Sequence, residues 1–159
     1  MKADSDDRKP RRSAYAAAVA LLAMREHSRL ELEQKLGQRD YPADEIRAAL
    51  DAMIDAGLIS DERASRARIA SGLRRGHGPA RIRQSLQQAG LPADSAMTGD
   101  DDEAINWVQQ ARAVAERKFG DTAPCDYKEW ARRARFLQSR GYDTQTIRKA
   151  LPGVSNSAL

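Results

Sequence analysis

The stretch RRGHGPARIR, residues 74–83, places arginines on both sides of a turn that contains two glycines and a proline. From His77 onward the pattern is a ring-bearing side chain, a turn residue, and apolar residues five and nine positions later. The same pattern begins fifty residues earlier at His27 and sixty-five residues later at Tyr142. Three copies in one register predict a tandem repeat, with this turn at the same place in each copy.

The residues around each copy carry the signals of helix ends. Ser28 followed by Glu31 is the pattern of a capping box. Gly57 stands where a helix would end in the left-handed conformation, and Asp61 is placed to cap the next helix. No stretch alternates with period two, so we predict no strand. The helices are predicted at about 14–26, 29–38, 43–56, 61–74, 79–89, 101–118, 126–140 and 143–151.

These helices predict an all-α fold, an elongated and curved tandem array of three-helix repeats of the helix-turn-helix kind, without a β-sheet. The stretch SAMTGDDDE that precedes the long helix is expected to be a loop or short turn. The expected divisions are a disordered tail at 1–13, an acidic first repeat at 14–58, a basic second repeat at 59–120 with an acidic loop at 99–103, a truncated basic third repeat at 121–152 and a disordered tail at 153–159.

The net charge of +4 is distributed in blocks of opposite sign. Residues 62–90 carry seven basic side chains against one acidic, whereas residues 91–111 carry none against five. A single surface arginine is most often simply solvated, but local pairing cannot neutralise a block of this kind, and basic faces steer anionic partners. The candidate partner- and DNA-binding residues are Arg63, Arg66, Arg68, Arg74, Arg75, Arg81, Arg83, Arg132, Arg133, Arg135 and Arg140.

The two glycines of residues 74–83 could cradle a phosphate or form a hinge between two helices. A P-loop needs a preceding strand and a following Lys-Ser/Thr, and a dinucleotide-binding turn needs a third glycine in a βαβ unit. Since none of these is present, we interpret the stretch as a hinge. Gly76 would end one helix in the left-handed conformation, and Gly78 would cap the next.

No catalytic or metal-binding set of side chains is evident. Cys125 is the sole cysteine, which excludes an internal disulfide and favours a reducing compartment. Together with His27 and His77 it matches no zinc spacing. We therefore expect no enzyme activity, no metal and no cofactor. The large aromatic residues at helical spacing are interpreted as core positions and not as platforms for nucleic-acid bases: Trp107, Phe119, Trp130 and Phe136.

The apolar segment SAYAAAVALLAM, residues 13–24, follows a basic stretch, as in a secretory signal. It is followed by no small-residue cleavage site, and it is shorter than the roughly 20 residues that span a membrane. We favour an amphipathic helix here, and we expect a cytoplasmic, monomeric protein that does not bind membranes.

The segment GLISDERASRARIASGLRRGHGPARIRQSLQQAGL, residues 57–91, resembles the core signature of the bacterial RecX regulatory proteins. The matching features are Gly-x-Ile-x-Asp, an arginine-bearing helix, the Gly-x-Gly-Pro turn and the closing Gly-Leu. SRLELEQKL and RARFLQSRGYDTQTIRKAL are similar to the first and third copies, so the resemblance covers residues 14–152. One departure is that Ala64 and Ser65 stand where the family usually has an aromatic residue followed by alanine.

This resemblance implies regulation without catalysis. RecX proteins bind the RecA recombinase filament on single-stranded DNA and suppress its ATP hydrolysis, strand exchange and SOS-related activities. The basic second and third repeats would meet acidic protein surface and DNA phosphates, and the acidic first repeat would meet a basic subunit edge. Inhibition would follow because the protein bridges subunits and blocks the groove that a second DNA needs.

Two alternatives stay open at this point. A sequence-nonspecific nucleic-acid-binding protein would act through phosphate contacts and would bind free single- or double-stranded DNA weakly. The third helix of the first repeat is acidic, which argues against reading of a DNA groove. It carries one basic residue, Arg47, against Asp44, Glu45, Asp51 and Asp55. A protein-only adaptor would bind no DNA. Salt dependence and the need for the recombinase separate these alternatives.

Overall fold

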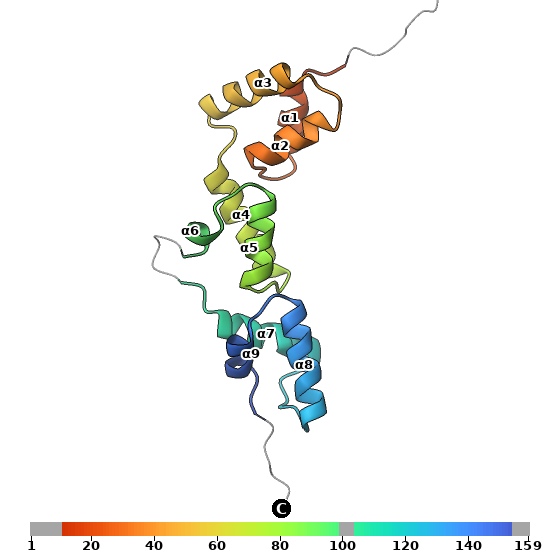
Figure 1. Ribbon diagram of the computed structural model, residues 1–159, viewed down its shortest axis with the longest axis vertical. Helices are drawn as coiled ribbons and strands as arrows, with labels where there is room; N and C mark the ends of the chain where they lie inside the picture. Colours follow the sequence, from red (N-terminus) through yellow and green to blue (C-terminus); the bar gives the residue numbers. More distant parts are fainter. Residues whose placement is uncertain (1–10, 99–103, 154–159) are drawn as a thin grey trace, which may run out of the picture. The chain divides into compact units, whose positions relative to one another are not determined.

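The computed structural model describes residues 11–98 and 104–153 (Figure 1). In these ranges every regular element is a helix and no strand occurs, which confirms the predicted all-α class. None of the described helices is both long and apolar enough to cross a membrane. The helices are α1 (Ala14–Leu22), α2 (Arg29–Gly37), α3 (Ala43–Asp55), α4 (Asp61–Arg74), α5 (Pro79–Gln88), α6 (Ala93–Thr98), α7 (Trp107–Phe119), α8 (Tyr127–Ser139) and α9 (Thr144–Ala150).

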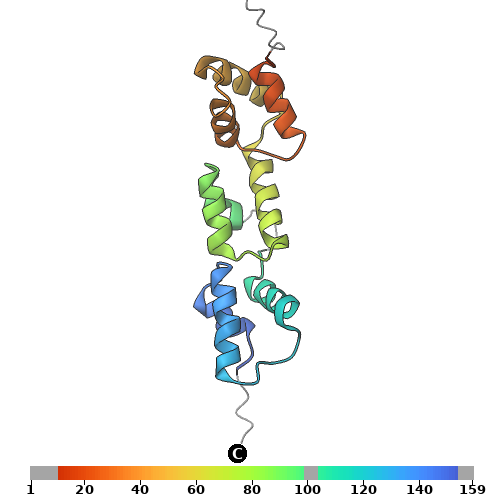
Figure 2. The same cartoon turned by 90° about the vertical axis from the view of Figure 1, so that its right-hand side faces the viewer.

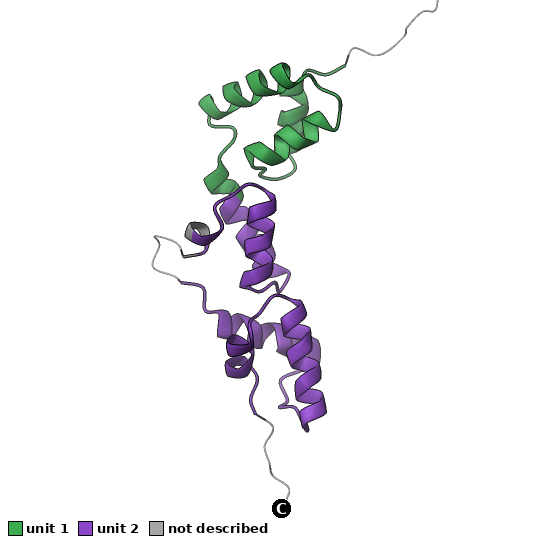
Figure 3. Cartoon of the chain, viewed as in Figure 1, with its two compact units in different colours: residues 1–64 green, residues 65–159 purple. Residues whose placement is uncertain are grey.

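The chain divides into two compact units, residues 1–64 and 65–159 (Figure 3). In the first unit α1, α2 and α3 pack against one another. Leu32 and Leu36, one turn apart on α2, are fully buried. Alanines such as Ala14 and Ala18 line the buried face of α1, and their small side chains allow the helices to approach closely.

The capping box at the start of α2 is confirmed. The Ser28 hydroxyl accepts a hydrogen bond from the Glu31 N–H at 3.1 Å, and the Glu31 carboxylate accepts one from the Ser28 N–H at 3.0 Å. The first helix was predicted to extend to residue 26, but α1 ends at Leu22. The chain turns before the buried His27, because it must reverse within a few residues for α2 to pack against α1.

The predicted tails fall largely outside the described residues, which begin at 11 and end at 153. Two residues of the predicted N-terminal tail contact the first unit. The Arg11 guanidinium lies 4.0 Å from the centre of the Tyr41 ring, and the Tyr41 hydroxyl donates to the Arg12 carbonyl at 2.8 Å. The tail prediction is therefore wrong for Arg11 and Arg12.

Helix α6 was not predicted. It covers residues 93–98, of which 95–98 belong to the stretch that we interpreted as a loop or short turn, and the acidic loop 99–103 lies outside the described residues. Pro92 directly precedes α6, a position in which its missing N–H costs little. Leu91 is buried just before α6, and Asp94 in its first turn forms an ion pair with Arg83 of α5 at 3.1 Å. The sequence of α6 alone does not predict a helix, and in the structure α6 contacts other parts of the second unit.

Helix α7 belongs with α8 and α9, which corrects two predictions. It begins at Trp107, after the cap Asn106, and not at residue 101, and it packs against α8 and α9 and does not close the second repeat. Its buried face, with Ala111 and Val114, shares one core with Leu137. The third repeat is therefore a complete three-helix group and is not truncated.

Candidate interaction surface

The glycines of residues 74–83 form a hinge, as predicted, and also a contact between repeats. Gly76 ends α4 with a φ of 75°, in the left-handed region, whereas Gly78 precedes α5 with an ordinary φ of −82°. The Gly78 N–H donates to the Arg140 carbonyl at 2.7 Å, and the Ala80 N–H donates to the Gly141 carbonyl at 3.1 Å. Figures 1 and 2 both show the start of α5 beside the end of α8. The turn of the second copy thus docks, backbone against backbone, on the equivalent turn of the third.

This docking gathers arginines that are far apart in the sequence. The Arg140 Nη1 donates to the Arg75 carbonyl at 3.0 Å, and the Arg81 Nη1 lies 3.4 Å from the Ser139 carbonyl oxygen. Within residues 11–98 and 104–153, no carboxylate forms an ion pair with Arg75, Arg81 or Arg140. We call these three side chains the arginine junction.

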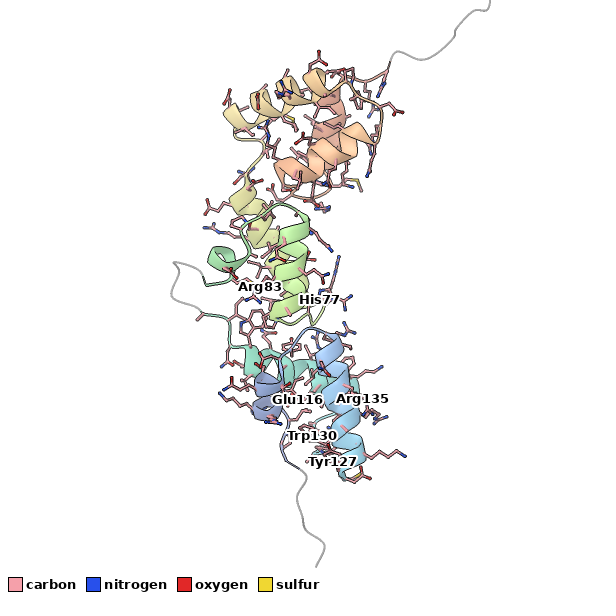
Figure 4. The ribbon with its side chains drawn as sticks, in the orientation of Figure 1. His77, Arg83, Glu116, Tyr127, Trp130 and Arg135 are labelled. Carbon is pink, nitrogen blue, oxygen red and sulfur yellow. The ribbon has the colours of Figure 1, made fainter. Side chains whose placement is uncertain are left out.

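His77 lies close enough to the arginine junction for the three arginine charges to change its pKa. Partial burial lowers the pKa of His77, and the charges of Arg81, Arg140 and Arg75 lower it further. Figure 4 shows His77 at the start of α5, facing away from α6. The imidazole therefore stays neutral at neutral pH and leaves the three guanidinium groups as the charge of the junction.

A second group of cations follows the exposed side of α8. Lys128, Arg132 and Arg135 are exposed and stand at positions i, i+4 and i+7 of this helix, so they share one face. Arg132 is 3.9 Å from the Glu129 carboxylate, while no described residue forms a hydrogen bond or ion pair with the side chains of Lys128 and Arg135. Figure 4 shows Arg135 on the outer side of α8. We call these three residues the α8 ridge; it leads toward Arg140 of the arginine junction.

Other predicted site residues already have partners within the protein. Arg63 forms an ion pair with Glu26 at 3.0 Å and donates to the carbonyls of Gly57 and Leu58, just after α3. Arg83 is paired with Asp94, and the Arg68 Nη1 donates to the Ser85 hydroxyl at 2.9 Å. Arg66 also has an interaction partner, whereas Arg74 is exposed and forms no hydrogen bond or ion pair with the described residues. From the sequence we expected almost no acidic partners for these arginines. Glu26 and Asp94, which pair with Arg63 and Arg83, lie outside the basic segment 62–90, so the local sequence does not show these ion pairs.

The prediction that Arg133 faces a partner is wrong. Its side chain is only 5% exposed, and its Nη2 lies 2.6 Å from the Glu129 carboxylate. The Nη1 donates to the Thr122 carbonyl at 2.7 Å, and the guanidinium lies 5.4 Å from the centre of the Phe119 ring. Arg133 therefore holds the segment before α8 against that helix. The neighbouring Arg132, about 100° further around the helix, remains outside.

The Glu129 carboxylate should make the third repeat sensitive to acid. The Cys125 N–H and then the Arg133 guanidinium lower the pKa of Glu129 from 4.5 to about 2. Because the folded-state pKa is the lower one, the stabilisation is complete above about pH 4.5 and is lost as the pH falls toward 2. We expect urea unfolding, followed by tryptophan fluorescence, to show this loss. In Glu129→Gln the corresponding pH dependence should be absent, and an unchanged pH dependence would contradict the assignment.

A hollow of about 190 Å³ in the third repeat does not extend the basic surface. Arg112 and Lys149 line it, but so do the carboxylates of Glu116 and Asp121. Because both signs are present, the hollow does not select an anion. Among the described residues no three His, Cys, Asp or Glu side chains gather in a group that could hold a metal ion.

Each of the three helix groups matches a model of a known protein family. Models described as the first, second and third three-helix domains of RecX match residues 14–52, 60–96 and 107–151. The chain belongs to the RecX family. The third RecX domain begins at Trp107, where α7 begins, which agrees with the packing of α7 against α8 and α9.

Relatives in the RecX family match most of the chain. The Regulatory protein RecX of Acidithiobacillus ferrooxidans is 43% identical over 136 residues, which are 86% of this chain and 87% of that protein. That of Pseudomonas syringae pv. tomato is 41% identical over 136 residues, 86% of this chain and 88% of the relative. The crystal structure of RecX from Lactobacillus salivarius has a TM-score of 0.64 and 22% identity and covers 84% of this chain and 89% of that chain, which supports the fold.

Proposed function

We propose that this RecX-family protein regulates the RecA recombinase as a cytoplasmic monomer. It binds the RecA filament on single-stranded DNA through the arginine junction and the α8 ridge. It thereby inhibits ATP hydrolysis, strand exchange and SOS-related activities without catalysing a reaction. Membership of a regulatory family supports a RecA-related partner. The observation that carries the proposal is that Arg75, Arg81 and Arg140 gather at one place and form no ion pair with a carboxylate of residues 11–98 or 104–153.

The arginine junction has the physical properties of a binding site for anions. Like charges held close together repel one another, so the free protein bears an electrostatic cost that a bound phosphate or carboxylate removes. The backbone bonds between residues 78–80 and 140–141 position two of the guanidinium groups before a partner arrives. Such preorganisation reduces the entropy that binding costs, and the planar guanidinium can contact a phosphate or carboxylate with two hydrogen bonds.

The first unit offers charges of the opposite sign. On α3, Asp44 and Asp55 are exposed, while Asp51 forms an ion pair with Arg29 at 2.8 Å. We propose that this acidic surface meets a basic edge of a RecA subunit. A protein that contacts subunit and strand together would bridge the filament and occupy the groove that a second DNA needs.

The test is a titration of the full chain into RecA that hydrolyses ATP on single-stranded DNA, at two salt concentrations. We expect hydrolysis to fall when the protein is well below the concentration of RecA. The proposal is contradicted if hydrolysis does not fall, or falls only when free DNA is saturated.

Sequence-nonspecific nucleic-acid binding is the second candidate function. The observation that favours it is the α8 ridge, which could contact phosphates without any recombinase. In that case the logarithm of the binding constant should fall by about 0.7 per tenfold increase in salt for each single-strand phosphate contact. Binding to the filament should retain a component that salt does not weaken, because part of the surface is protein.

A further inference from the structure

The third repeat carries an exposed aromatic stack that the proposed function does not use. Tyr127, the first residue of α8, is 73% exposed. Its ring stacks on that of Trp130, with 6.1 Å between centroids and 14° between planes. Trp130 in turn packs against the core of the third repeat. Figure 4 shows the two side chains together at the N-terminal end of α8. Trp130 therefore supports a tyrosine ring that remains largely open to solvent.

The stack stands at one end of the basic surface. Lys128 follows Tyr127 directly, Arg135 lies two helical turns further on, and Arg140 follows the last residue of α8. At 1.5 Å per residue, Tyr127 and Arg140 are roughly 19 Å apart along the helix. A nucleic-acid strand stacked as in a duplex would place about five phosphates over this length, at 3.4 Å each.

We propose that the Tyr127–Trp130 stack and the α8 ridge form a binding site for single-stranded nucleic acid. A base stacks on the open face of Tyr127, and Lys128 and Arg135 contact the phosphates beside it. This combination of a cationic track and an aromatic platform is how proteins hold single strands without reading their sequence. The acidic side chains of a peptide would match the cations, but they carry no flat ring that could stack on Tyr127. In a duplex the faces of the bases are already occupied by their neighbours, so the site should prefer a single strand.

The inference deepens the proposed function by naming what the third repeat binds, but its test needs no RecA. The full chain is titrated into a fluorescein-labelled oligothymidylate of twenty nucleotides, and binding is followed by fluorescence anisotropy at several salt concentrations. Tyr127→Ala should weaken binding by about 5- to 150-fold, the range found for loss of one stacked base. Tyr127→Phe keeps the aromatic face and should bind within about twofold of the unchanged chain.

The salt dependence distinguishes stacking from phosphate contact. Tyr127→Ala should leave the slope of affinity against salt unchanged, whereas Lys128→Ala should reduce it by about 0.7. Tyr127→Leu is a second variant that keeps an apolar cover over Trp130 and lacks the π face, so it should weaken binding as alanine does. Circular dichroism of each variant checks that the helices are retained.

Three results would overturn this inference. One is oligothymidylate binding by Tyr127→Ala or Tyr127→Leu equal to that of the unchanged chain. A second is loss of binding in Tyr127→Phe, and a third is equal affinity for a duplex of the same length. If the first result is accompanied by loss of RecA inhibition in Tyr127→Ala, Tyr127 is assigned to a protein contact. Inhibition that persists without oligonucleotide binding would leave the proposed function standing.

Discussion

Replacing Gly78 with alanine is expected to destabilise the second unit by about 3–4 kcal/mol and to lower its melting temperature by about 15–20 °C. A Cβ at this position would lie 2.5 Å from the carbonyl carbon of Gly141 and 2.6 Å from its oxygen. These are backbone atoms, which cannot rotate away as a side chain could. The turns would have to separate and would lose the hydrogen bonds from Gly78 and Ala80. The φ of −82° suits alanine, so the cost comes from the contact.

The measurement is urea and thermal unfolding of Gly78→Ala beside a matched variant, Gly37→Ala. Gly37 is the last residue of α2, and a Cβ there meets nothing within 4 Å. Alanine at position 37 should be neutral or slightly stabilising. Gly78→Ala should also lose inhibition of RecA, because the separated turns no longer bring Arg140 to Arg75. If the two variants are equally stable, the repeats do not dock through these turns.

Replacing Arg75, Arg81 and Arg140 together with alanine is expected to raise the concentration needed to inhibit RecA by at least about 100-fold, since a hydrogen bond to a charged group contributes about 1.5–3 kcal/mol. Arg75 and Arg81 are exposed and Arg140 is half-buried, and none of the three forms an ion pair with a carboxylate of residues 11–98 or 104–153. We therefore expect most of this change to be lost contact with the partner. The sequence alone directs the substitution to Arg74, Arg75, Arg81 and Arg83 and leaves out Arg140. In the structure Arg83 is already paired with Asp94.

The control removes the same charge from the first unit, as Arg25, Arg29 and Arg47 to alanine. Exposed ion pairs such as those of Arg25 and Arg29 contribute little to stability, so this variant should fold and inhibit. Arg75→Ala alone adds a second control, because the Arg75 side chain forms no hydrogen bond in the described structure. It should weaken inhibition without altering the melting temperature. Equal inhibition by both triple variants would show that the arginine junction is not the contact surface.

Some features of the interaction surface could be predicted only in part from the sequence. The basic second and third copies were visible as charge blocks, and the hinge at Gly76 and Gly78 was visible as a turn signal. The open ring of Tyr127 was missed, because the helical stripe that contains it also contains Trp130 and reads as core. Its position at the first residue of a helix, where burial is often incomplete, was the available signal.

The helical class, the three repeats and most helix ends follow from local sequence patterns. Capping boxes and left-handed glycines act over four residues or fewer, so the information lies next to its effect. The tertiary structure alone decided that α7 packs with α8 and α9, that Arg133 turns inward while Arg132 stays outside, and that Arg75 and Arg140 share one site. These outcomes depend on contacts between residues that are tens of positions apart in the sequence. Burial and close backbone contact select among the possible arrangements, and both exist only once the helices have packed.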